Sequence, residues 1–203
     1  MAGETMPPVD LEPLALSLYD IGAVRLGQFV LHSGRRSPIY FDLRLLVSYP
    51  AVLRQVAAAY ALVLRRLQFD ILAAYPYAGL PIGTAIALEM NIPLIYPRKT
   101  AKSYGTGKQV EGVWQVGQRA VVIEDLITSG DSILQAIAAL KAASLQVEDA
   151  VVLIDREQSG REMLAQAGYN LHAIISMRQM LGILERHNRI TASKTAEVLA
   201  LLT

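Results

Sequence analysis

Two adjacent carboxylates follow an apolar run near the middle of the chain. Residues 120–123 (Ala-Val-Val-Ile) precede Glu124 and Asp125, and residues 128–132 (Thr-Ser-Gly-Asp-Ser) follow two further apolar residues. Hydroxyls, a glycine and the start of a helix form an anion cradle, because outward-pointing backbone N–H groups and the helix dipole favour negative charge. The acids would repel a phosphate, so sugar hydroxyls are their better partners. The pattern therefore predicts a site for a sugar phosphate such as ribose 5-phosphate.

Thr128, Ser129 and Asp131 have a second interpretation. Residues of these types commonly cap the first turn of a helix and need no ligand to do so. A purely structural strand, however, has no need of paired acids at its end, which favours the binding site.

A basic segment, residues 98–112, carries a second kind of chemistry. Four cations precede its first acid, Glu111: Arg98, Lys99, Lys102 and Lys108. Cationic side chains aimed at a leaving group that departs with negative charge lower the barrier, and one such donor is worth ~10²–10³ in rate in other enzymes. Gly105 and Gly107 would let the loop close over a substrate. A solvated basic loop is the alternative.

The elements that must position these residues alternate along the chain. Apolar runs and turn residues predict a parallel sheet covered by helices, with right-handed crossovers and ligands beyond the carboxyl ends of the strands. We expect a helix over 11–22, a hairpin of 28–32 and 38–43, a helix over 49–67, a strand over 69–74, a helix over 80–90, strands over 92–96 and 119–123, a helix over 132–143, a strand over 150–154, a helix over 160–167, a strand over 171–175 and a mostly helical tail from 177.

Composition narrows the class of protein. The 203 residues suit one α/β domain, and 53% hydrophobic residues can form a sizeable core. A net charge of +1 gives no global field for nucleic acid, so any anion site must be local. Cysteine is absent, which excludes disulfides, thiolate zinc sites and a cysteine nucleophile and fits a cytoplasmic protein.

Membrane insertion is not expected. Residues 71–88 carry no charge, but two prolines and two glycines interrupt them, so a strand, a turn and a helix start explain the segment better than a membrane span. The first eight residues lack the basic and apolar regions of a signal peptide.

Residues 121–132 resemble the phosphoribosyl pyrophosphate motif of type I phosphoribosyltransferases. The resemblance implies one domain over 1–203, with a central mostly parallel sheet flanked by helices. A small hood (mainly 1–45) would precede the core (about 46–180) and a helical tail (177–203). It implies that Glu124 and Asp125 hold the ribose hydroxyls, with Asp125 also catalytic, and that the 5-phosphate lies on Thr128, Ser129, Gly130, Asp131 and Ser132. Leu126 and Ile127, between them, are also implied to contact phosphoribosyl pyrophosphate.

Four further segments resemble orotate phosphoribosyltransferases, including the corresponding domain of UMP synthase, over about residues 27–178. In residues 31–44, Tyr40 and Phe41 match aromatic positions that can stack on a pyrimidine, while His32 replaces the usual lysine and so loses a fixed charge. Plain core packing is the alternative for both aromatic residues. A further segment, residues 155–160, contains Arg156, which matches an arginine that contacts orotate in that family. Arg156 and Thr128 complete the implied orotate contacts, and a guanidinium suits planar oxygen-bearing ligands. A salt bridge of Arg156 with Asp155 or Glu157 is its alternative.

The other two segments resemble the pyrophosphate loop (75–82) and the mobile catalytic loop (98–112) of that family. Tyr77 matches the first, and Ala78 beside it leaves the contact to main-chain N–H groups. The resemblance assigns Arg98, Lys99 and Lys102 to pyrophosphate and to catalysis. Lys102 would reach into a neighbouring subunit, which implies a homodimer with shared sites. Tyr104 stands where many bacterial relatives carry a catalytic histidine.

The implied reaction transfers ribose 5-phosphate from phosphoribosyl pyrophosphate to orotate, with Mg²⁺ brought by the substrate rather than by a protein cage. His32, His172 and His187 are scattered and suggest no metal site. Two alternatives are a phosphoribosyltransferase for another base, against which residues 31–44 and Arg156 argue, and a non-catalytic phosphoribosyl pyrophosphate sensor. Asp131 replaces a small neutral residue of the family, so its carboxylate must turn away from the phosphate.

Overall fold

A six-stranded sheet forms the centre of the computed structural model, which describes residues 10–30, 34, 36–99 and 109–200. The strand order is β5-β4-β3-β6-β7-β8, and neighbours run parallel except that β5 is antiparallel to β4. The mostly parallel α/β sheet predicted from the sequence is confirmed. Its strands are β3 (Ile71–Ala74), β4 (Leu94–Pro97), β5 (Val110–Glu111), β6 (Arg119–Ile127), β7 (Gln146–Asp155) and β8 (Asn170–Ser176).

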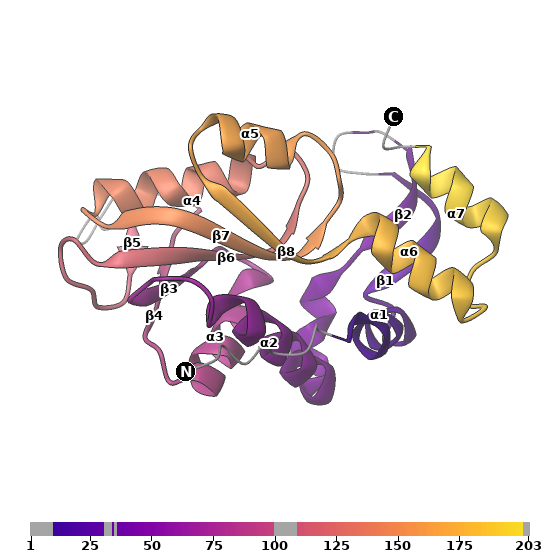
Figure 1. Cartoon of the computed structure of the whole chain (residues 1–203), viewed down its shortest axis with the longest axis horizontal. Helices are drawn as coiled ribbons and strands as arrows, with labels where there is room; N and C mark the ends of the chain where they lie inside the picture. The colour runs from indigo at the N-terminus through magenta and orange to yellow at the C-terminus, as the bar shows by residue number, and fades with distance from the viewer. Residues whose placement is uncertain (1–9, 31–33, 35, 100–108, 201–203) are drawn as a thin grey trace, which may run out of the picture.

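Helices cover both faces of this sheet, as Figure 1 shows. On one face lie α2 (Pro50–Leu64) and α3 (Gly79–Met90), and on the other lie α4 (Asp131–Ala142) and α5 (Gly160–Gln166). Strand β6 supplies both cores, because alternate side chains of a strand point to opposite faces. Val121 and Ile123 belong to the core on the α2 side, and Ala120 and Val122 belong to the core on the α4 side.

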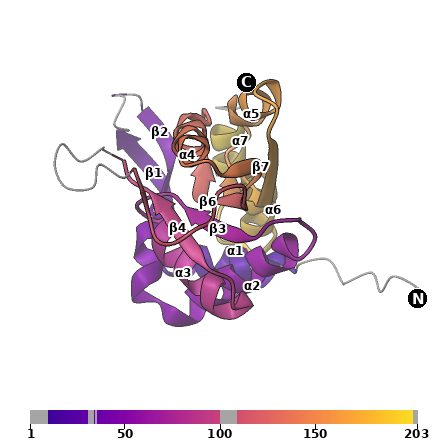
Figure 2. The same ribbon diagram turned by 90° about the vertical axis from the view of Figure 1, so that its left-hand side faces the viewer.

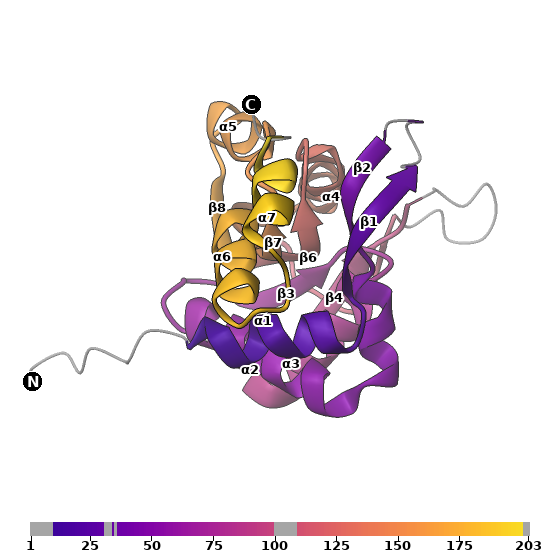
Figure 3. The same cartoon turned by 90° about the vertical axis from the view of Figure 1, so that its right-hand side faces the viewer.

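The N-terminal and C-terminal parts of the described chain meet beside the sheet (Figure 3). The antiparallel hairpin of β1 (Val24–Val30) and β2 (Arg36–Phe41) follows α1 (Leu11–Asp20). Helix α1 packs against α6 (Met177–Arg186), and α7 (Ala192–Leu199) packs against β2. The C-terminal helices therefore support the N-terminal hairpin.

The predicted elements are present, with differences at several boundaries. Strand β1 begins at Val24 and not at residue 28, and β7 begins at Gln146 and not at residue 150. Strand β6 runs on through the two acids to Ile127, although the sequence predicted its end at residue 123. The segment predicted as a loop over 98–112 contains β5, and the short 3₁₀ helix η1 (Leu43–Ser48) was not predicted. Residues 71–88 divide into β3, a turn and most of α3, and no helix in the described ranges is long and apolar enough to span a membrane.

Candidate active site

A cavity of about 340 Å³ opens at the carboxyl ends of β3 and β6, where the sheet topology predicts a ligand. Figure 2 shows the hairpin standing beside this end of the sheet. The cavity brings together four segments that are far apart in the sequence. Its lining residues are Tyr40, Phe41, Leu43, Arg44, Tyr75, Pro76, Tyr77, Ala78, Lys99, Glu124, Asp125, Leu126, Thr128, Ser129, Gly130 and Ser132.

Two helices begin at the cavity wall. The N-cap residue of α3 is Ala78 and that of α4 is Gly130, and neither helix start has a side-chain cap hydrogen bond. The capping interpretation of Thr128, Ser129 and Asp131 is therefore wrong, because Gly130 takes the N-cap position with a φ of +90°. Uncapped first-turn N–H groups carry partial positive charge, so each helix start can hold an anion.

Asp131 does not contribute to anion binding at the start of α4. Its side chain is exposed, and one carboxylate oxygen accepts a hydrogen bond of 2.6 Å from the Ser129 hydroxyl. Asp131 is the first residue of α4 and not its cap. Asp131 thus accepts the hydrogen bond of the Ser129 hydroxyl. Ser129 lines the cavity, whereas Asp131 does not.

The acid pair lies between the two helix starts. Glu124 is 4% exposed, and its carboxylate accepts the backbone N–H of Asp125 at 3.1 Å. Burial, reinforced by the neighbouring charge of Asp125, raises the pKa of Glu124 to about 9. Asp125 is half-buried and accepts the backbone N–H of Leu126 at 2.9 Å. Near neutral pH Glu124 therefore keeps its proton, which lets its carboxyl group both donate to and accept from hydroxyl groups.

Lys99 provides a positive charge at the opposite wall. Its ammonium lies 4.5 Å from the ring centre of Tyr77 and 5.8 Å from that of Tyr75, which holds the cation over two aromatic faces. Arg98 is placed differently. Its guanidinium forms a 2.7 Å ion pair with Glu111, and it lines a neighbouring cavity of about 300 Å³ on the far side of Tyr75. Lys102, which the sequence made the chief catalytic candidate, lies outside the described residues, as does Tyr104.

Known proteins are similar to this chain in sequence and in fold. Residues 46–168 match the family model described as a phosphoribosyl transferase domain. The orotate phosphoribosyltransferase of Caenorhabditis elegans is 36% identical over 98% of this chain and 89% of its own length. This chain belongs to the orotate phosphoribosyltransferase family.

Longer relatives of the family contain a similar chain as one part. The bifunctional enzyme PyrF/PyrE of Nostoc sp. is 41% identical over 89% of this chain and 38% of its own length. The solved structure of Leishmania donovani UMP synthase superimposes with a TM-score of 0.88 at 44% identity, over 95% of this chain and 42% of that one. The chain thus spans about two fifths of the length of these relatives.

In this member of the orotate phosphoribosyltransferase family, Arg156 follows β7 and does not line the cavity itself, but it lies next to Phe41, which does. Its guanidinium carbon lies 5.8 Å from the ring centre of Phe41, and its Nε atom is buried without a hydrogen-bond partner in the described structure. Burial also lowers the pKa of Arg156. A buried donor without a partner is costly, so this atom is available to a ligand.

The salt-bridge interpretation of Arg156 is wrong. Asp155 pairs with Arg161 at 2.9 Å, and Glu157 pairs with Arg178 at 3.6 Å. Both acids that could have neutralised Arg156 are therefore engaged elsewhere.

The aromatic residues of the hairpin serve both packing and the cavity wall. Phe41 packs against the core on the α2 side and also lines the cavity. Tyr40 packs on Phe29 with 5.4 Å between ring centres, and its hydroxyl accepts a 3.1 Å hydrogen bond from Arg44. Core packing and ligand contact are thus compatible at these positions, while His32 lies outside the described residues.

Four residues that line the cavity were not predicted from the sequence: Leu43, Arg44, Tyr75 and Pro76. For Arg44, a cation two residues after Asp42 was the local signal that could have marked it. The Arg44 guanidinium is held by Asp42 at 2.7 Å and by the Tyr40 hydroxyl. Tyr75 gave no signal, because its position between the two cavities depends on the fold. Ile127, which the resemblance placed among the phosphoribosyl pyrophosphate contacts, is buried and does not line the cavity.

Proposed function

We propose that this chain is an active orotate phosphoribosyltransferase. It would transfer ribose 5-phosphate from phosphoribosyl pyrophosphate to orotate, giving orotidine 5′-monophosphate and pyrophosphate in UMP biosynthesis. One observation carries the proposal: two helix starts without side-chain caps face one cavity, with a carboxylate pair between them. Phosphoribosyl pyrophosphate has the same order of groups, a phosphate at one end, a diphosphate at the other and hydroxyls between.

The residues divide the work of the proposed reaction. The start of α4 holds the 5-phosphate, and Glu124 and Asp125 hold the ribose hydroxyls. The start of α3 and the Lys99 ammonium attract the diphosphate, whose negative charge grows as its bond to the sugar breaks. Positioning two anionic substrates together supplies much of the rate enhancement, because it replaces a bimolecular encounter.

The base would lie between the hairpin and β7. Phe41 offers an aromatic face, and the unpaired Nε of Arg156 offers a charged donor to a carboxylate. A pyrimidine carrying a carboxylate fits these two groups better than a neutral purine does. This argument favours orotate over the other bases.

Mg²⁺ fits the site as a companion of the diphosphate. In the described ranges no group of three or more metal-binding side chains is present, and the raised pKa of Glu124 makes it a poor ligand. Asp125 is the cavity carboxylate that would lie nearest to the ion, which the substrate's phosphate oxygens and water would hold. Bound Mg²⁺ neutralises part of the charge of the leaving diphosphate.

A homodimer with shared active sites forms part of the proposal. Four large hydrophobic side chains are exposed on α3, on β4 and just after β5: Leu88, Tyr96, Val113 and Val116. They offer apolar area for a second copy near the edge of the sheet that β5 and β4 form. The cytoplasmic location expected from the cysteine-free sequence stays a prediction.

The direct test mixes the protein with orotate, phosphoribosyl pyrophosphate and Mg²⁺ and follows the loss of orotate's ultraviolet absorbance. We expect turnover by the wild-type protein and its loss in Lys102→Ala. A folded wild-type protein that binds phosphoribosyl pyrophosphate without turnover would contradict the proposal and favour a sensor. Turnover with a purine in place of orotate would identify a different transferase.

Arg156→Ala tests whether Arg156 contacts orotate. Loss of a charged donor should raise the KM for orotate by ~10-fold or more and leave the KM for phosphoribosyl pyrophosphate within twofold. Equal KM values for orotate in both proteins would remove Arg156 from the base site.

A further inference from the structure

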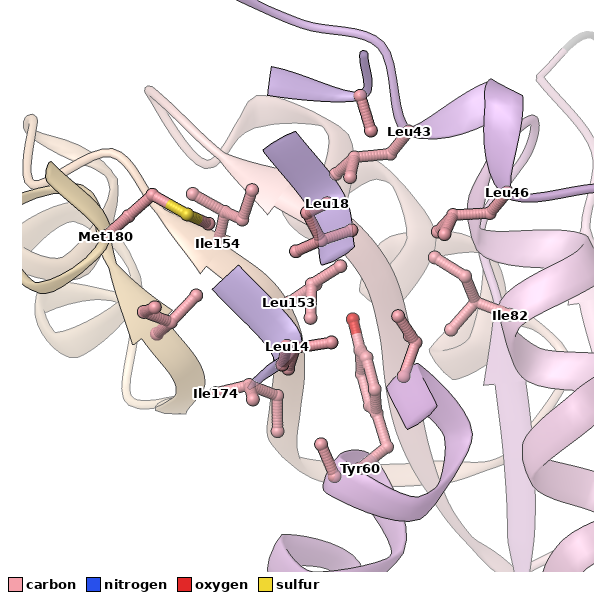
Figure 4. Close-up of a cluster of buried hydrophobic side chains, with 14 of the residues drawn as sticks. Leu14, Leu18, Leu43, Leu46, Tyr60, Ile82, Leu153, Ile154, Ile174 and Met180 are labelled. Atoms are coloured by element: carbon pink, nitrogen blue, oxygen red, sulfur yellow. The ribbon is translucent and has the colours of Figure 1, made fainter. Parts of the chain in front are cut away.

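A buried tyrosine hydroxyl contacts the backbone of the acid pair. Tyr60 is fully buried in α2 and is among the largest side chains in the core; Figure 4 shows its hydroxyl pointing away from its own helix. The hydroxyl donates a 2.6 Å hydrogen bond to the backbone carbonyl of Glu124. Tyr60 thus ties α2 to the end of β6 that carries the acid pair.

This contact lies where β6 loses one of its neighbours. Strand β3 pairs with β6 as far as Ala74 and Ile123, and the backbone N–H of Tyr75 then donates to the Ile123 carbonyl at 2.9 Å. Beyond that point β6 continues for residues 124–127, paired only with β7 among the described strands. The acid pair therefore lies on an overhang, where the backbone has fewer constraints than in the centre of the sheet.

Packing alone does not account for the hydroxyl. A phenylalanine would fill nearly the same core volume without burying a polar group, and burial of a hydroxyl is unfavourable unless it is hydrogen-bonded. The hydroxyl of Tyr60 meets this condition at one particular carbonyl, that of the first acid. On the side of α3, Gly79 packs so closely that a Cβ there would lie 3.0 Å from the Ile123 carbonyl oxygen. The overhang is thus held from two helices.

We propose that Tyr60 is a positioning residue that fixes the β6 overhang so that Glu124 and Asp125 meet the ribose hydroxyls. The inference rests on the proposed function, because it assumes that the acid pair binds a ribose. Hydrogen bonds weaken steeply with distance and misalignment, so a small shift of the overhang would weaken ribose binding. The Tyr60 hydroxyl is bonded to β6 and not to the start of α3 or to Lys99, so its removal should leave the diphosphate contacts there in place.

Tyr60→Phe tests this role with two ligands that occupy different parts of the cavity. Calorimetry should show ribose 5-phosphate binding weakened about fivefold, the factor that corresponds to one net hydrogen bond. Binding of inorganic pyrophosphate with Mg²⁺ should stay within twofold of wild type. The matched control is Tyr19→Phe, which removes a tyrosine hydroxyl that donates to the Arg189 carbonyl at 3.2 Å, away from the cavity. Equal weakening of both ligands would indicate general loosening and overturn the proposal, as would no weakening of either.

Kinetics and hydrogen exchange extend the test. In Tyr60→Phe the KM for phosphoribosyl pyrophosphate should rise about fivefold with kcat within twofold, whereas an inert wild-type protein would count against the proposed function and not against this inference. If the variant does not fold, amide exchange of the wild-type protein replaces it. Ribose 5-phosphate should then slow exchange at the backbone amides of Asp125 and Leu126, while pyrophosphate should leave both unchanged; unchanged exchange with both ligands would overturn the proposal.

Discussion

Glu124 combines deep burial with a functional carboxyl group. Burial and the charge of Asp125 raise its pKa to about 9, against an ordinary value of 4.5. Between these values the unfolded chain releases the proton while the folded protein keeps it. The contribution of this group to stability is therefore complete below pH 4.5, declines as the pH rises and is lost once the pH passes about 9.

Glu124→Gln should remove this pH dependence. An amide of similar shape does not ionise, so the melting temperature of the variant should fall less than that of the wild type between pH 5 and pH 8.5. Ribose 5-phosphate binding near neutral pH should change little, because the amide both donates and accepts hydrogen bonds, as the protonated carboxyl group does. Differential scanning calorimetry at the two pH values measures the first effect. Parallel decreases in both proteins would show that Glu124 does not set the slope.

Asp131→Asn addresses the negative charge beside the phosphate loop. The carboxylate of Asp131 engages the Ser129 hydroxyl and repels an incoming phosphate. The amide should tighten ribose 5-phosphate binding by ~2–5-fold at low salt, and the gain should shrink as salt screens the charge. The melting temperature should drop slightly, since an acid in the first turn of α4 favours the helix. Titration calorimetry at two salt concentrations decides this, and weaker binding in the variant would be contrary to expectation.

At the scale of residues, the sequence predicted which side chains belong to the site better than it predicted the hydrogen bonds between them. Local sequence patterns predicted the acid pair, Lys99 and Phe41 as site residues, and all of them line the cavity. The role of Tyr60 was not predictable, because it depends on which carbonyl lies opposite a helix 64 residues away.

At the level of elements, the loop after β6 is held against the start of α5. The backbone N–H of Gly160 donates to the Thr128 carbonyl at 2.9 Å. A Cβ at position 160 would lie 2.5 Å from Cγ1 of Ile127 and 2.7 Å from the Thr128 carbonyl oxygen. The phosphate loop thus takes its position partly from a second crossover.

Gly160→Ala should displace that loop. We expect a loss of about 1–3 kcal/mol in the free energy of unfolding from overpacking, together with weaker ribose 5-phosphate binding. Gly182→Ala is the control, because its Cβ would meet nothing closer than the Arg186 guanidinium at 3.8 Å within α6. That change should be neutral or stabilising by about 0.5–1 kcal/mol. Urea denaturation compares the two, and equal stability of both variants would contradict the packing argument.

The element boundaries show where sequence reasoning stops. Long apolar runs predicted the central strands, because burial on both faces requires them. The extension of β6 was missed since hydroxyls and glycine suggested a loop, whereas Leu126 and Ile127 pair with Ile154 and Asp155 of β7. Strand β5 has two residues and depends on pairing with Tyr96 and Pro97, which no local pattern reveals.

At the level of the whole molecule, the shared-site dimer makes a quantitative prediction. Lys102→Ala and Asp125→Asn should each be inactive alone. If Lys102 serves the neighbouring site, mixed dimers contain one intact site of two. Equal mixtures should therefore regain about a quarter of wild-type activity after subunit exchange. The orotate absorbance assay measures the recovery, with size-exclusion chromatography to confirm dimers, and no recovery in exchanged dimers would place Lys102 in its own subunit's site.

The packing of α7 against β2 also bears on how the protein is made. The ribosome releases the hairpin early, and the whole parallel sheet is synthesised before α7 emerges. Until then, the nascent hairpin lacks the helix that supports it. The cavity wall on β2, which carries Tyr40 and Phe41, is therefore completed near the end of translation. A growing chain can form its phosphate loop before the side of the cavity that would hold the base is in place.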